Sequence, residues 1–136
     1  MASKKHKDWV RHRAKCNLKG VFRELVCVIE KDIETFAALP YEEREGLGRY
    51  KCKSDEAVAT IGEIDGSNNF LHGRKLSCVR VIRKTRSIKA YFGNDLIFKA
   101  VPQWNSGTLE CDLFIDDEVY SLWQLSEKAI GDLLFS

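Results

Sequence analysis

The feature that most constrains the fold is the stretch from Leu76 to Trp123, where short apolar-rich segments alternate with turn signals. Five segments in it read as β-strands, and glycine, proline, asparagine or aspartate closes most of them within a few residues. Because short loops join consecutive segments, neighbouring strands should pair antiparallel. We predict strands over residues 76–84, 87–92, 96–101, 108–115 and 118–124.

Helices are expected on both sides of these strands. Apolar residues recur at three- and four-residue steps from Leu18 to Phe36, which predicts one long amphipathic helix that Pro40 ends. Residues 49–53 and 57–64 read as a further hairpin, whose inward face the pattern does not reveal. Ser126 is expected to cap a short C-terminal helix. The predicted fold is therefore α+β, with a long N-terminal helix on an antiparallel meander sheet of about six to seven strands.

The length of 136 residues fits one domain. We expect residues 1–7 to be a basic disordered tail and residues 8–136 to form the single α+β domain. No apolar run approaches the ~20 residues that a membrane-spanning helix needs, so no membrane partner is expected. The cysteines are odd in number and lack C-x-x-C spacing, which favours reduced, mostly buried thiols in a cytoplasmic protein; they are Cys16, Cys27, Cys52, Cys78 and Cys111.

Charge alternates strongly along the chain although the net charge is only +2. Residues 1–20 and 66–94 are basic, with net charges of +6 and +7, whereas residues 21–65 and 95–136 carry −5 and −6. The basic arm comprises Lys4, Lys5, Lys7, Arg11, Arg13, Lys15 and Lys19. The basic strand segment comprises Arg74, Lys75, Arg80, Arg83, Lys84, Arg86 and Lys89.

Cations on a sheet beside aromatic side chains can track a phosphate backbone and stack bases. The alternative is that the acidic strands after Asp95 neutralise these cations across the sheet. Among the tryptophans, Trp9 is the best candidate for contact with a partner. Trp104, in a predicted turn, is either a lid on the sheet edge or an exposed contact, and Trp123 is expected in the core.

No motif carries a catalytic or metal-binding prediction. His12 and Cys16 would share one helical face, but zinc requires more ligands and a nucleophilic cysteine requires a shaped pocket. The sequence therefore favours a small non-enzymatic binding module without a cofactor, which engages nucleic acid or a nucleoprotein through the basic arm and basic strands. The alternative is a protein-interaction module of inhibitor, immunity or adaptor type, which binds an acidic protein surface through its charged faces and an exposed tryptophan.

Overall fold

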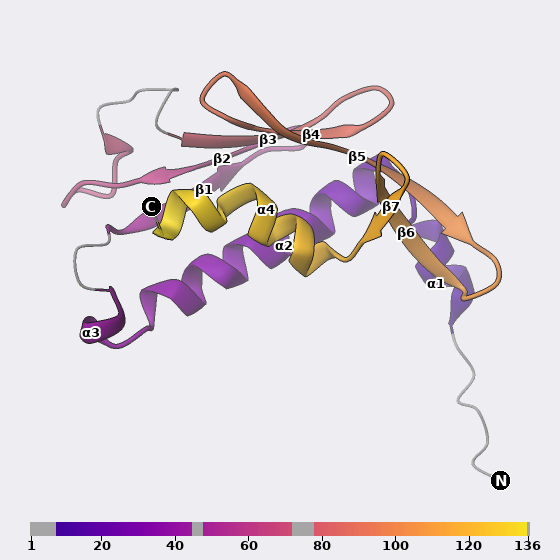
Figure 1. The fold of residues 1–136 in the computed structure, drawn as a ribbon, viewed down its shortest axis with the longest axis horizontal. Helices are drawn as coiled ribbons and strands as arrows, with labels where there is room; N and C mark the ends of the chain where they lie inside the picture. The colour runs from indigo at the N-terminus through magenta and orange to yellow at the C-terminus, as the bar shows by residue number, and fades with distance from the viewer. Residues whose placement is uncertain (1–7, 45–47, 72–77, 136) are drawn as a thin grey trace, which may run out of the picture.

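The computed structural model describes residues 8–44, 48–71 and 78–135. Within this part of the chain, seven antiparallel strands form one sheet whose spatial order equals the chain order. Figure 1 shows the sheet above and the helices below it. The strands are β1 (Tyr50–Ser54), β2 (Val58–Glu63), β3 (Cys78–Arg83), β4 (Ile88–Phe92), β5 (Asp95–Asn105), β6 (Glu110–Ile115) and β7 (Glu118–Tyr120). The helices are α1 (Trp9–Ala14), α2 (Leu18–Ala37), α3 (Tyr41–Arg44) and α4 (Leu122–Phe135).

This arrangement confirms the predicted α+β meander. The core lies between one face of the sheet and helices α2 and α4, and it includes Leu25 of α2 and Leu125 of α4, both fully buried. Ala59 and Ile61 of β2 are buried in the same core, so they mark the inward face that the sequence left open. We call the opposite side of the sheet the outer face. In Figure 1 no helix of the described chain covers it.

The predicted long helix is confirmed as α2, but a separate short helix, α1, precedes it across a break in the chain. α1 ends at Ala14 and α2 begins at Leu18. Asn17 caps α2, because its side-chain oxygen accepts a hydrogen bond from the backbone N–H of Gly20 at 2.8 Å. A Cβ atom at position 20 would collide with the carbonyl of Lys15, so glycine permits the close approach of the two segments. Hydrophobic periodicity alone did not reveal this break.

The C-terminal helix begins five residues earlier than expected, because Ser121 rather than Ser126 caps it. Ser121 Oγ accepts from the Gln124 N–H at 3.2 Å, and Gln124 Oε1 accepts from the Ser121 N–H at 2.8 Å. This reciprocal pair is a capping box. Ser126 is instead buried within α4, and its hydroxyl donates to Asp32 of α2 at 2.7 Å. The hydrogen bond ties the two helices together.

Strand β5 runs through Pro102, where the sequence analysis ended it. Its pairing with β4 ends at Ala100, and from Val101 to Asn105 it pairs with β6. Pro102 therefore lies where one side of the strand has no neighbour, and its missing N–H is tolerated there. The continuation also places Trp104 in a strand rather than in the predicted turn.

A disulfide joins Cys16 to Cys111, and this corrects the prediction of reduced thiols throughout the chain. The bond links the α1–α2 junction to β6 across 95 positions of sequence. Cys27, Cys52 and Cys78 remain thiols. The fold brings the bonded pair together, and neither cysteine has a local spacing that would have indicated the bond.

The β1–β2 turn gives a prediction about pH. Asp55 accepts from the N–H groups of Ala57 and Val58 at 2.8 and 2.9 Å, and these hydrogen bonds lower the pKa of its carboxyl. Ionised Asp55 therefore stabilises the fold above about pH 4, and this contribution is lost as pH falls through the lowered pKa. We expect Asp55→Asn to lower the urea midpoint at neutral pH and to match wild type once the pH falls below the lowered pKa of the carboxyl.

The control is Asp117→Asn, at an exposed aspartate of the β6–β7 turn. It should leave the urea midpoint nearly unchanged at either pH. A difference between Asp55→Asn and wild type that stays constant from neutral to acid pH would contradict the assigned role of the carboxylate.

Candidate functional site

The outer face carries five cations from four strands. The register places Lys53, Thr60, Arg80 and Tyr91 in one row across β1 to β4, and Ile82, Lys89 and Lys99 in another across β3 to β5. Because side chains alternate along a strand, residues of these rows point away from the helices. The five cations are Lys51, Lys53, Arg80, Lys89 and Lys99.

Lys89 and Lys99 are direct partners across β4 and β5. Like charges directly opposite one another destabilise a sheet, because their side chains lie close together on the same face. Acid residues could relieve this repulsion, but no described residue forms an ion pair with either lysine. The pair therefore forms a concentrated positive charge that an external anion would relieve.

Arg80 lies beside Tyr91 on the outer face. Its guanidinium carbon is 5.4 Å from the centroid of the Tyr91 ring, and a terminal nitrogen donates to the carbonyl of Gly93 at 3.2 Å. The remaining Nε is buried and lacks a hydrogen-bond partner. A buried donor without a partner is costly, and because this atom has almost no exposed surface, a ligand on the outer face can reach it only if the Arg80 side chain moves.

The acidic strands do not neutralise these cations through ion pairs. Within the described chain, the only ion pair joins Arg11 to Asp8 at 3.2 Å on α1. On the outer side of β6, Asp112 lies opposite Gln103 and accepts a hydrogen bond from Asn105 at 2.9 Å. The predicted cross-strand neutralisation is thus absent from the described residues, and the positive charge of β1 to β5 stays available.

The described part of the basic arm, from Arg11 onward, lies on the other side of the sheet. α1 packs on β6, and Arg13 sits over the ring of Trp104 at 5.8 Å. Trp104 pairs with Cys111, the disulfide partner of Cys16, on the helix-covered face. Trp9, Arg11 and Lys15 are exposed on this side. The structure therefore separates the described part of the arm from the cations of the outer face.

The remaining predicted site residues divide into two groups. Lys84 and Arg86 are exposed in the β3–β4 turn, while Arg83 is half-buried and donates its Nε hydrogen to the carbonyl of Glu56 at 3.2 Å. Arg83 thus supports the neighbouring β1–β2 turn. The others lie outside the described residues and have no place in the site as described; they are Lys4, Lys5, Lys7, Arg74 and Lys75.

Sequence reasoning missed Lys51, Lys53 and Lys99 as members of this surface. Each belongs to a segment with a mixed or acidic net charge, so a count along the chain did not single it out. Their alternating positions in the predicted strands indicated that they could share one face of the sheet. Only the register shows which residues of the neighbouring strands lie beside each of them.

The tryptophans also differ from expectation. Trp104 is half-buried under Arg13, which agrees with the lid interpretation. Trp123 was expected in the core but is 67% exposed, because α4 begins at Leu122 and turns the indole outward. Trp9 is 43% exposed and stays a candidate contact residue.

The described residues offer little to catalysis or metal binding. Cys16 is in a disulfide, so it cannot serve with His12 as a ligand or nucleophile. No group of three or more potential metal ligands occurs in the described chain. Four groups have shifted pKa values, and they do not converge on one pocket. Tyr50, Cys52 and Asp55 lie at one end of the sheet and Tyr120 lies at the other. None of the described helices is long and apolar enough to cross a membrane.

Comparison with models of protein families, with curated proteins and with solved structures finds no match to this chain. The functional argument therefore rests on the geometry of the outer face.

Proposed function

We propose that the protein is a non-enzymatic module that binds single-stranded nucleic acid on the outer face of its sheet. The observation that carries this proposal is the opposed pair Lys89 and Lys99, beside Arg80 and Tyr91, on a face that no described helix covers. Lysine and arginine can follow a phosphate backbone, and a base can stack on tyrosine. An antiparallel sheet presents both kinds of side chain at fixed spacing.

A duplex fits this surface less well than a single strand. The outer face is a broad sheet rather than a projecting helix or ribbon of the kind that enters the major groove. Tyr91 can stack only on a base whose face is free. The exposed cations of the β3–β4 turn, Lys84 and Arg86, extend the positive surface at one end of the strands. This favours a strand of nucleic acid that crosses β3, β4 and β5.

The salt dependence of binding tests the proposal. If all five outer-face cations contact phosphates, log affinity for oligothymidylate should fall with log salt at a slope of about −3.5. Replacing Lys89 and Lys99 together by glutamine should reduce the slope to about −2 and weaken binding at low salt. Fluorescence anisotropy of a labelled oligothymidylate measures both quantities.

The matched control replaces Lys19 and Lys31, two exposed lysines of α2, by glutamine. It removes the same charge from the helix side of the molecule and should leave the slope unchanged. Equal losses for the two double variants would mean that net charge alone drives binding, and absence of binding at low salt would reject the proposal.

A protein-interaction module is the second candidate, favoured by the adjacent exposed side chains Trp9 and Val10 on α1. Exposed tryptophans frequently anchor protein interfaces. If Trp9 serves a protein partner, Trp9→Ala should leave the affinity for oligothymidylate unchanged. We also propose a cytoplasmic location, supported by the three cysteines that remain thiols and opposed by the Cys16–Cys111 disulfide, which is unusual in a reducing compartment; cell fractionation tests it.

A further inference from the structure

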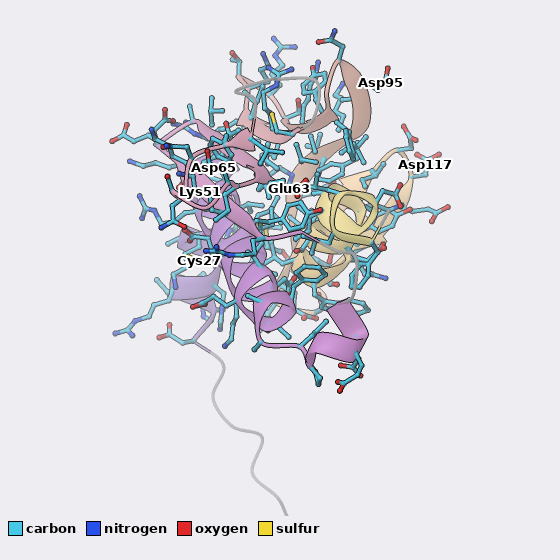
Figure 2. The ribbon with its side chains drawn as sticks, turned by 90° about the vertical axis from the view of Figure 1, so that its left-hand side faces the viewer. Cys27, Lys51, Glu63, Asp65, Asp95 and Asp117 are labelled. Atoms are coloured by element: carbon cyan, nitrogen blue, oxygen red, sulfur yellow. A yellow bond between two sulfur atoms is a disulfide. The ribbon has the colours of Figure 1, made fainter. Side chains whose placement is uncertain are left out.

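A groove runs along one flank of the molecule between α2 and the edge of the sheet. It has a volume of about 410 Å³. Phe22 and Val26 of α2 line it, together with the exposed thiol of Cys27, and Ser54 and Asp55 line it from the side of β1. Figure 2 shows Cys27 on α2 and Lys51 on β1 along this same flank.

β1 runs antiparallel to α2 beside this groove. At one end of the strand, Tyr50 contacts Phe36 near the C-terminus of α2, with ring centroids 5.8 Å apart. At the other end, Ser54 lines the groove with residues from the first half of α2. From Lys19 to Glu30 the groove side of α2 spans about 16 Å, which matches about five residues of an extended chain.

β1 is an edge strand, and the backbone groups of three of its five residues lack partners among the described residues. Arg49 O accepts from Ile64 N at 2.8 Å, and Asp55 N donates to Val58 O at 2.9 Å. Alternation along an antiparallel pair then directs the N–H and C=O groups of Lys51 and Lys53 toward β2. Those of Tyr50, Cys52 and Ser54 point away from β2. None of these outward groups has a hydrogen-bond partner among the described residues.

The two sides of this edge differ in chemistry. Lys51 and Lys53 lie on its outer side, while Phe22 and Val26 lie on its helix side. Lys53 is the exposed cation of this outer side, because the ammonium of Lys51 donates to the carbonyl of Asn68 at 2.6 Å and lies 4.9 Å from the centroid of the Phe70 ring, toward the β2–β3 loop. A strand added to β1 would alternate its side chains between the lysines and the apolar floor.

We propose that this groove binds an extended peptide in which acidic and apolar residues alternate, added to β1 as a further strand. Backbone hydrogen bonds to Tyr50, Cys52 and Ser54 supply affinity, and the two rows of side chains supply specificity. A second copy of the chain fits less well. Antiparallel pairing of two β1 strands about Cys52 would set Lys51 of each copy against Lys53 of the other. This site shares Lys51 and Lys53 with the outer-face cations proposed to contact nucleic acid, but its other contacts, the free edge of β1 and the groove beside α2, are separate.

The rate at which a disulfide reagent modifies the Cys27 thiol, with and without a bound peptide, tests the proposal. Burial, with a smaller effect of Glu30, raises the pKa of Cys52 to about 12, and Cys78 is buried. At about pH 8 only roughly one Cys52 in ten thousand is a thiolate, so the rate with a disulfide reagent reports Cys27. An alternating glutamate–valine peptide should slow this rate about tenfold at roughly ten times its Kd.

Controls distinguish strand addition from general shielding. An alternating lysine–valine peptide should give no protection. Ser54→Pro removes an outward N–H and should abolish protection, whereas Ser54→Ala should keep it. The paired substitutions Lys51→Glu and Lys53→Glu should reverse the preference to the lysine–valine peptide, and this variant leaves the backbone intact if Ser54→Pro disturbs folding.

Three outcomes would overturn the proposal. The two peptides could protect Cys27 equally, or the glutamate–valine peptide could fail to protect it. The rate of Cys27 modification could also decrease as the protein concentration rises in the absence of peptide. The last outcome would show that a second copy covers the groove. The double variant at Lys89 and Lys99 should bind the peptide as wild type does, so failure here and failure of the proposed function are separable.

Discussion

Reduction of the Cys16–Cys111 disulfide is expected to lower the free energy of unfolding by about 4–5 kcal/mol. The bond closes a loop of 95 positions, and a cross-link over so long a loop strongly restricts the unfolded chain. This loss is a large part of the total stability of an ordinary domain. Urea unfolding of the oxidised protein, of the reduced protein and of a Cys16→Ser/Cys111→Ser double variant measures it.

Cys27→Ser is the matched control for this experiment. Cys27 is free and exposed, so its replacement should leave the urea midpoint unchanged and the protein still sensitive to reductant. Equal midpoints for the oxidised and reduced protein would mean that the cross-link adds no stability. The reduced protein should also show whether α1 stays on β6 when only contacts such as that of Arg13 with Trp104 hold it.

Leu25→Ala should have the second largest effect, a loss of about 2–5 kcal/mol in the free energy of unfolding. Leu25 is fully buried in α2, within the core that joins this helix to the sheet and to α4. Truncation removes apolar contacts and leaves a cavity that the surrounding strands can fill only in part. Leu113, at 3% exposed on β6, should behave similarly.

Leu96→Ala provides the comparison with the same chemical change. Leu96 is 53% exposed on the outer face, so its truncation should cost well under half as much as that of Leu25. Similar losses at both leucines would mean that the assigned inward and outward faces are wrong.

The fold could be predicted because its signals are local. Alternating apolar residues and turn residues mark each strand of the meander, and short loops determine which strands pair. The errors come from interactions that periodicity does not encode. The cap at Asn17 separates α2 from the short helix α1, which the apolar pattern from Leu18 onward does not include, and the capping box of Ser121 with Gln124 lies in residues that also suit a strand.

The candidate site was less predictable than the fold. Counting charge along the chain grouped the basic arm with the strands, although the sheet separates the described arm from the outer face. The same counting omitted Lys99, which register places opposite Lys89. It also included Arg83, whose guanidinium donates to a backbone carbonyl. The pairing of Cys16 with Cys111 could not be predicted either, because 95 positions separate them and only the folded chain brings them together.

The strand order of the sheet has a consequence for how the molecule forms. Each strand pairs only with its predecessor and successor in the chain, so the sheet can assemble hairpin by hairpin with small closure entropies. α2, made before any strand, finds its second helical neighbour only when α4 at the end of the chain is complete. During synthesis its apolar stripe therefore stays partly uncovered until the strands and α4 have been made, and nascent chains that stop before Leu122 should be the forms most dependent on chaperones.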